Sequence, residues 1–219
     1  MSNSRQLKVI ALPGDLGACA YYRVFSPLAA MERAGFAKVT RLEETRLGGK
    51  PQLFVRPSQL KGHDIAVFSR QPDGKVGELM RIAQQMGIKV VFDIDDDIYT
   101  VSPNSPAYAS FGKDWRKVGA FVKYDKGTVR QIERQARRVG GPSKAELTVD
   151  EAQRMAAEAK ERFQGLVQNI RRADLLTVST ERLREVYSQL RDDVVVLPNQ
   201  LEQRDWEAAV EDRYQRDPE

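Results

Sequence analysis

The fold is decided by residues 89–99, KVVFDIDDDIY. An apolar run at 90–92, rich in β-branched residues, predicts a buried strand of a parallel sheet. The run ends where four carboxylates gather, and these belong to Asp93, Asp95, Asp96 and Asp97. Because ligands bind beyond the carboxyl ends of the strands in an open parallel α/β sheet, a site is expected here. Close carboxylates also repel and raise one another's pKa unless cations neutralise them or N–H groups bind them. Because such a cluster is unfavourable by itself, it indicates a function.

A strand, a glycine loop and a helix open the chain. Residues 7–12 predict the strand, and helical periodicity runs from about residue 20 to residue 34. The loop between them contains Gly14 and Gly17, and it can bring backbone N–H groups close to an anion such as a phosphate. Its spacing matches neither the dinucleotide motif nor the P-loop, so a tight turn between strand and helix is the simpler interpretation.

Side chains that could hold a ligand follow the first and third predicted strands. Tyr21, Tyr22 and Arg23 open the first helix, where they can stack on a ligand and clamp it, although such tyrosines are equally often core residues. Arg70 follows the strand at 64–69, which places it at the same rim as the glycine loop and the Asp cluster. It can balance the carboxylates or bind an anionic ligand, and the simpler alternative is a surface arginine that ends a strand.

Strands and helices alternate over most of the chain. Further strands are predicted at 39–42, 88–92, 174–180 and 194–197, with helices at 75–86 and 181–190 and a loose glycine and proline stretch at 48–57. This alternation predicts the α/β class, with a Rossmann-like parallel sheet flanked by helices and right-handed crossovers.

A basic helical excursion interrupts the alternation at residues 107–172. Long helices are predicted at 107–139 and 149–172, and residues 113–172 carry 15 Lys and Arg against 8 Asp and Glu. Such a stretch is usually a solvated helix face, and the alternative is a surface for nucleic acid, acidic lipid or another anionic acceptor. In that alternative, Arg134, Arg137 and Arg138 are the residues expected to bind.

Composition limits the class of protein. The chain has 219 residues, 41% of them hydrophobic, and a formal net charge of +4, which fits a globular protein with a mild basic bias. Its single cysteine excludes an internal disulfide, and no apolar run approaches the roughly 20 residues that span a membrane. The N-terminus has no signal peptide pattern, so a cytoplasmic location is expected.

Four blocks of the sequence together resemble the N-terminal half of a GT-B glycosyltransferase, of the family-4-like group that includes many bacteriophage-encoded enzymes. They are the loop and helix start at 17–23 (GACAYYR), FDIDDDIY at 92–99, ADLLTVSTERLREVY at 173–187 and VVVLPNQLEQRDW at 194–206. The resemblance covers roughly residues 5–35 and 64–206. Two departures stand out, because the family often has Asn-Gly-hydrophobic-Asp where this chain has residues 199–202, NQLE, and often a His where FDIDDD stands.

The resemblance implies two Rossmann-like domains, an N-terminal one for the acceptor and a C-terminal one for a nucleotide-sugar donor. Residues 1–206 would then be the acceptor-side domain and 207–219 the start of a linker or tail, with the donor domain absent or supplied by a partner. No cofactor is expected, and the nucleotide sugar is a co-substrate. The acceptor is unknown, with an anionic glycan and DNA as candidates. Asp95 or Asp96 would be the catalytic acidic group, and the cleft would be lined by Gly14, Gly17, Tyr22, Arg23, Arg70, Asp93, Asp97 and Asn199.

Other interpretations of the Asp cluster stay open. An Asp-x-Asp pair can hold Mg²⁺ or Mn²⁺, although GT-B transfer generally needs no bound metal and none is expected here. A strand followed by Asp-Ile-Asp resembles the first motif of haloacid-dehalogenase phosphatases, with Asp93 as nucleophile and Asp95 as general acid, but Gly-Thr does not follow. The simplest alternative is a cluster that caps a helix and pairs with Arg70. His63 and Cys19 are expected to be a turn residue and a non-catalytic thiol.

Overall fold

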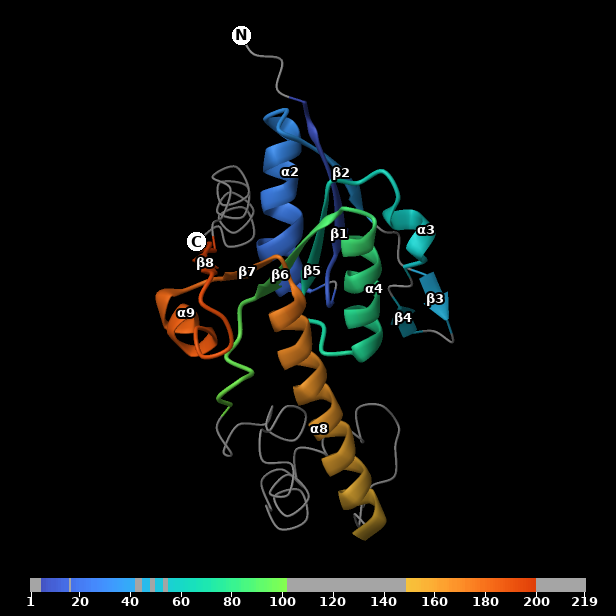
Figure 1. The fold of residues 1–219 in the computed structure, drawn as a ribbon, viewed down its shortest axis with the longest axis vertical. Coiled ribbons are helices and arrows are strands. Elements are labelled where there is room, and N and C mark those ends of the chain that lie inside the picture. The colour runs from blue at the N-terminus through green and yellow to red at the C-terminus, as the bar shows by residue number, and fades with distance from the viewer. Residues whose placement is uncertain are drawn as a thin grey trace, which may run out of the picture.

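The fold centres on a six-stranded parallel sheet (Figure 1). The computed structural model describes residues 5–15, 17–41, 45–47, 50–52, 55–101 and 149–199. The sheet has the order β2-β1-β5-β6-β7-β8, with bounds β1 Leu7–Leu12, β2 Ala37–Arg41, β5 Ile65–Ser69, β6 Lys89–Ile94, β7 Leu175–Val178 and β8 Val194–Val196. A separate antiparallel hairpin is formed by β3 (Thr45–Leu47) and β4 (Lys50–Gln52).

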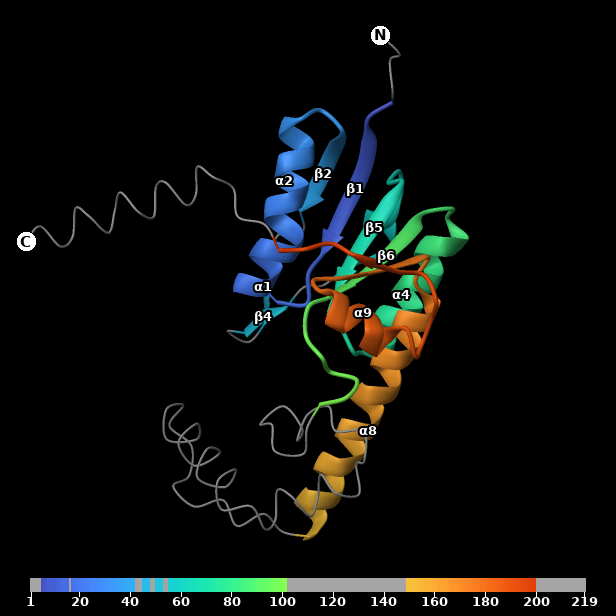
Figure 2. The same cartoon turned by 90° about the vertical axis from the view of Figure 1, so that its left-hand side faces the viewer.

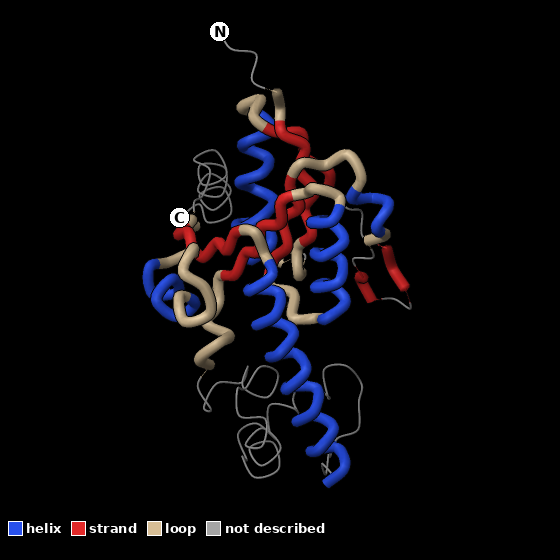
Figure 3. Tube along the Cα trace, in the orientation of Figure 1, coloured by secondary structure: helices blue, strands red, loops and turns tan. Residues whose placement is uncertain are grey.

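Helices cover both faces of the sheet, as Figure 2 shows. On one side lie α1 (Ala18–Ala20), the π-helical turn η1 (Tyr21–Phe25) and α2 (Ser26–Arg33). On the other side lie α4 (Gly74–Gln85), α8 (Val149–Arg172) and α9 (Glu181–Tyr187), and a short helix, α3 (Pro57–Leu60), stands near the hairpin (Figure 3). This is the layered arrangement that a parallel sheet requires to bury both faces.

Side chains alternate between the two faces of the strands, so each strand contributes to two apolar cores. Ile10, Phe68 and Phe92 point to the α4, α8 and α9 side, where they join one large cluster with residues of those helices. Val9 and Ala11 point to the other side and pack against η1 and α2. Successive side chains of β1 point to opposite faces, so this strand packs in both cores.

Glycine allows α8 to approach the loop before α4. A Cβ on Gly165 would lie 2.0 Å from the Pro72 carbonyl oxygen, and one on Gly77 would lie 2.4 Å from Asn169 Oδ1. Asn169 in turn donates hydrogen bonds to the carbonyls of Gln71 (2.9 Å) and Asp73 (3.1 Å). The last turns of α8 are thereby held against α4, while its first turns project past the carboxyl edge of the sheet (Figure 1).

The α/β class and the Rossmann-like parallel sheet flanked by helices are confirmed. Helix 149–172 and strand 7–12 have the predicted bounds, and other ends differ by a few residues, as expected of fraying termini. The prediction of a loose stretch at 48–57 was wrong, because residues 50–52 form a strand that pairs with 45–47. The predicted helix at 107–139 and the tail at 207–219 lie outside the described residues. Among the described helices, none combines the length and apolarity that a membrane crossing demands.

Candidate functional site

The candidate site is the carboxyl rim, where β1, β5, β6, β7 and β8 end side by side. The chain order reverses between β1 and β5, since β1 connects to β2 on one side and the later strands extend to the other. Ligands of open α/β sheets bind at such a switch point, beyond the strand ends. The polar side chains of the site come from the last residues of these strands or from the segments that follow them.

The inner pair, Arg23 and Asp93, is buried at this rim. Arg23 Nε donates to Asp93 Oδ2 (3.1 Å) and Arg23 Nη2 to Asp93 Oδ1 (2.5 Å), so the two groups meet in a bidentate arrangement. Their side chains are only 2% and 3% exposed. Thr177 Oγ1 donates a further hydrogen bond to Asp93 Oδ1 (2.6 Å). Burial raises the pKa of the Asp93 carboxyl, while Arg23 and Thr177 act to lower that pKa.

Arg23 also holds the chain where it leaves β8. Its Nη1 donates to the carbonyl oxygen of Leu197 and to Asn199 Oδ1, the latter at 3.0 Å. One guanidinium therefore fastens the turn after β1 to the ends of β6 and β8. Because all three nitrogens of the guanidinium donate hydrogen bonds, the buried charges of Arg23 and Asp93 both have partners. Arg23 is therefore a structural anchor of the rim.

The outer cluster, made of Arg70, Asp15 and Asp96, lies nearer to solvent. Arg70 Nη2 contacts Asp15 Oδ2 at 2.7 Å, and Arg70 Nη1 contacts Asp96 Oδ2. The Arg70 side chain is 29% exposed. Its backbone has φ +49°, a left-handed conformation that costs a non-glycine residue free energy and that clusters at binding and active sites. Its N–H donates to the Asp93 carbonyl (2.9 Å), which holds β5 against β6 at this bend.

Glycines shape the loop that carries Asp15. A Cβ on Gly14 would lie 2.4 Å from the Ser69 carbonyl oxygen, so the close approach of this loop to β5 requires glycine. Asp15 Oδ1 accepts a hydrogen bond from the N–H of Gly17 (2.7 Å). The described part of the loop thus turns the Asp15 carboxylate towards Arg70 at the switch point. This favours the tight-turn interpretation over a phosphate site.

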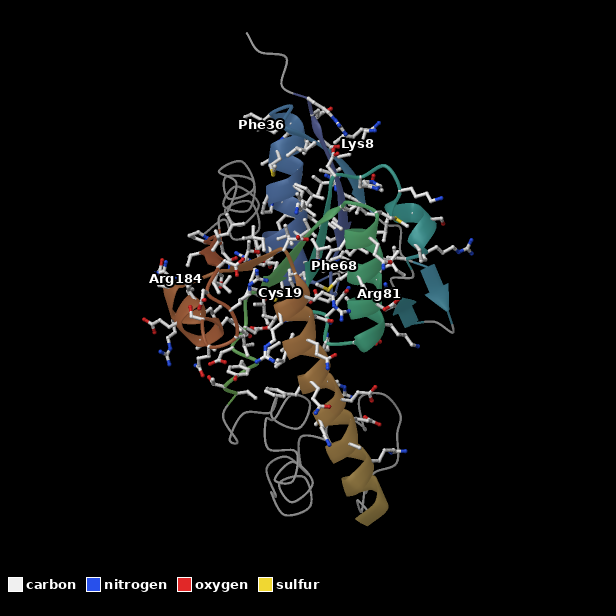
Figure 4. The ribbon with its side chains drawn as sticks, in the orientation of Figure 1. Lys8, Cys19, Phe36, Phe68, Arg81 and Arg184 are labelled. Carbon is white, nitrogen blue, oxygen red and sulfur yellow. The ribbon has the colours of Figure 1, made fainter. Side chains whose placement is uncertain are left out.

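Cys19 lies next to Arg70 at the rim, where Figure 4 labels it among side chains from several elements. Burial, a hydrogen bond to Asp95 and the negative charge of Asp95 raise the pKa of the Cys19 thiol, against a smaller lowering by Arg70. Arg70 Nη1 lies 3.7 Å from Cys19 Sγ. A thiol with a raised pKa is a poor nucleophile at neutral pH, in keeping with the expected non-catalytic role.

Backbone turns fix the carboxylates that follow β6. Asp97 accepts hydrogen bonds from the N–H and the hydroxyl of Thr100, at 2.8 and 2.5 Å, and so closes a local turn. The buried hydroxyl of Tyr187 donates to the Asp96 carbonyl (2.7 Å) and accepts from the Ile98 N–H (3.2 Å). Burial raises the pKa of Tyr187, so its hydroxyl stays protonated and keeps this contact at physiological pH. These contacts bind the backbone at Asp96 and Ile98 to α9.

Two exposed tyrosines flank the rim on η1. The rings of Tyr21 and Tyr22 meet edge to face, with centroids 5.2 Å apart, and the two residues are 43% and 37% exposed. A π-helical turn is rare and frequently accompanies a functional site. This turn directs Arg23 inwards and leaves Tyr21 and Tyr22 at the surface. The two tyrosines are therefore not core residues.

The rim brings together the residues that the sequence singled out, in two different environments. Arg23, Asp93 and Asn199 meet at the inner pair, and Arg70 meets Asp96 in the outer cluster. Asp97 instead closes a turn. The sequence interpretation missed Asp15 and Thr177. The available signal was their position, because Asp15 follows β1 closely and Thr177 lies near the end of β7. His63 contacts the Leu60 carbonyl and Thr40 at the amino edge, a turn position as expected.

No three metal-binding side chains of the described residues lie close enough together to share a metal ion. Protein-family models and curated protein sequences contain no match to this chain.

Proposed function

We propose that this chain is the acceptor-binding N-terminal domain of a GT-B glycosyltransferase, which transfers a sugar from a nucleotide-sugar donor to an acceptor hydroxyl. The observation that carries the proposal is the convergence of Asp95 and Asp96 with the turn after β1 at the switch point of a parallel sheet. A carboxylate at this rim can accept the proton of an attacking hydroxyl. The donor domain is proposed to be a separate chain or a further part of the gene product.

The charges of the rim support an uncharged acceptor over an anionic one. Both arginines are already paired with carboxylates, Arg23 with Asp93 and Arg70 with Asp15 and Asp96. The rim has five aspartates against these two arginines, so a phosphate would meet net negative charge. Hydroxyl groups can instead donate hydrogen bonds to the carboxylates, and exposed tyrosine rings can lie against the apolar face of a sugar.

The geometry gives less support to the other candidates. A phosphatase that uses Asp93 as its nucleophile needs an open carboxylate, and the Asp93 side chain is 3% exposed and bound on both oxygens. A module that binds nucleic acid through the basic helices depends largely on residues 102–148, which lie outside the described residues.

Turnover in the natural assembly tests the proposal. The gene product that carries or recruits the donor domain is assayed for release of nucleoside diphosphate from a panel of nucleotide sugars, with neutral and anionic glycans as acceptors. Asp95→Asn and Asp96→Asn are each expected to lower kcat, at least one of them by about 100-fold or more, as loss of a general base does. Asp174→Asn, at the amino edge of the sheet, is the matched control and should keep full turnover. Full activity in both rim variants would refute the role of the carboxylates.

A further inference from the structure

The loop that follows β6 carries the two proposed catalytic carboxylates, and one hydroxyl of α9 binds its backbone. We call residues 95–100 the carboxylate loop. Tyr187, the last residue of α9, donates a hydrogen bond to the Asp96 carbonyl (2.7 Å) and accepts one from the Ile98 N–H (3.2 Å). The Ile98 N–H also donates to the Asp96 carbonyl, at 3.0 Å. The Tyr187 hydroxyl therefore holds both ends of a tight turn that begins next to Asp95.

Aromatic rings bind the end of the carboxylate loop to two helices. The ring of Tyr99 stacks on Phe163 of α8, with centroids 5.8 Å apart and an interplanar angle of 13°. The centroid of the Tyr99 ring lies 6.5 Å from that of the Tyr187 ring. Aromatic pairs at such separations attract one another beyond the area that they bury. The carboxylate loop is thus in contact with both α8 and α9.

Burial makes the hydroxyl of Tyr187 informative. The residue is 0% exposed and belongs to the large apolar core. A phenylalanine ring fills nearly the same space, whereas a buried hydroxyl costs free energy unless it is hydrogen-bonded. Both hydrogen bonds given above join this hydroxyl to the backbone of the carboxylate loop. The contacts of its oxygen with the loop therefore explain why a tyrosine stands at this core position.

We propose that Tyr187 is a positioning residue, whose hydroxyl sets where the side chains of Asp95 and Asp96 stand at the rim. Asp95 is the first residue after β6 and Asp96 carries the bound carbonyl, so a shift of this turn moves both carboxylates. Their partners belong to other segments, since Asp95 is hydrogen-bonded to Cys19 and Asp96 contacts Arg70. A displacement of about 1 Å is enough to slow a reaction that depends on such groups. That these carboxylates act on an acceptor rests on the proposed function, whereas their positioning does not.

Alkylation of Cys19 reports the position of Asp95 without turnover. Burial raises the pKa of the Cys19 thiol, and the hydrogen bond and the charge of Asp95 raise it further. Tyr187→Phe keeps the ring and removes the hydroxyl, so Asp95 should move away and this pKa should fall. In the full chain, the pH profile of iodoacetamide alkylation should shift to lower pH by about half a unit or more, which makes alkylation at pH 7 at least about threefold faster. In an Asp95→Asn background the same substitution should add no shift, because both changes act through one contact.

Two control variants on α9 separate positioning from loss of stability. Ser188→Ala removes a hydroxyl that donates to the Arg184 carbonyl, and Val186→Ala opens a cavity at a residue that is 3% exposed. Both keep the Tyr187 hydroxyl, so neither should shift the profile. A general loosening of the fold would instead raise the alkylation rate at every pH without moving the midpoint.

A Tyr187→Phe profile that coincides with that of the unaltered chain overturns the proposal, and so does an equal shift in Val186→Ala. If Tyr187→Phe does not fold, amide hydrogen exchange of the unaltered chain decides. The Ile98 amide is expected to exchange at least about 100-fold more slowly than in an unstructured peptide, and exchange at the unstructured rate overturns the proposal.

Turnover in the natural assembly separates this proposal from the proposed function. Tyr187→Phe should lower kcat by about tenfold with KM nearly unchanged, because the carboxylates are displaced and not removed. Full kcat in Tyr187→Phe would overturn the positioning role. An assembly that transfers no sugar would refute the proposed function alone, since the alkylation profile does not depend on turnover.

Discussion

The rim contains two arginine sites built from the same chemical groups, and they differ in burial. The inner pair, Arg23 with Asp93, is almost completely buried and every polar atom of the two side chains that is described has a partner. The outer cluster, Arg70 with Asp15 and Asp96, is part-exposed and sits on a strained backbone. The difference teaches that charge at a strand end is structural where water is excluded and available to a ligand where water enters.

Physical chemistry explains why the two sites should respond differently to mutation. Removal of one partner from a buried pair leaves an uncompensated charge, whereas part-exposed pairs contribute little to stability because water screens them. The inner pair should therefore control the free energy of unfolding. On the proposed function, the outer cluster should control acceptor binding and turnover.

The largest expected effect is loss of the inner pair. Arg23→Met strands the Asp93 carboxylate in the sheet and should lower the free energy of unfolding by about 3–5 kcal/mol, the usual result of breaking a buried pair. Guanidinium denaturation measures the change. The double variant Arg23→Met with Asp93→Leu should recover much of the loss, because no buried charge remains. If Arg23→Met lowers the free energy of unfolding by less than about 1 kcal/mol, the pair behaves as a solvent-exposed one. The contrast with the outer cluster would then be wrong.

A smaller effect is expected where the loop of the outer cluster meets β5. Gly14→Ala sets a Cβ against the Ser69 carbonyl, a backbone atom that cannot turn away, and should cost about 1–3 kcal/mol of unfolding free energy. Gly17→Ala is the matched control, since its Cβ would approach only the Asp15 side chain, at 3.2 Å. Thermal or guanidinium unfolding compares the two. Equal stability in both variants would show that the close approach of loop and strand is dispensable.

The outer cluster should hardly affect stability. Arg70→Gly removes two part-exposed ion pairs but also relieves the positive φ, so the free energy of unfolding should change by less than about 1 kcal/mol in either direction. On the proposed function, turnover by the natural assembly should nevertheless fall, because Asp96 loses the contact that positions it. A destabilisation as large as that of Arg23→Met would make both sites structural and erase the difference between them.

The sequence predicted the members of these sites better than their pairing. Strands were predictable because apolar runs ended at Gly14, Arg70 and Asp93, and parallel strands bring such ends to one edge. The choice of Arg23 over Arg70 as the partner of Asp93 depends on a π-helical turn, which leaves no periodic signal in the sequence. The positive φ of Arg70 was equally hidden, since glycine or asparagine usually marks such a position. Tertiary packing decided both the partner of Asp93 and the backbone conformation of Arg70.

Cys19 reports on the outer cluster with the smallest perturbation. Its raised pKa means that the thiolate is scarce at pH 7, so alkylation by iodoacetamide should be slower than for a free thiol and should accelerate about tenfold per pH unit until the raised pKa is reached. Asp95→Asn removes a charge that raises the pKa and should speed alkylation at pH 7, whereas Arg70→Gly removes the cation that lowers it and should slow alkylation. Asp174→Asn, at the amino edge of the sheet, is the control and should leave the rate alone. Mass spectrometry of the folded protein measures these rates. An Asp95→Asn rate equal to that of the unaltered chain would show that Asp95 does not act on the Cys19 thiol.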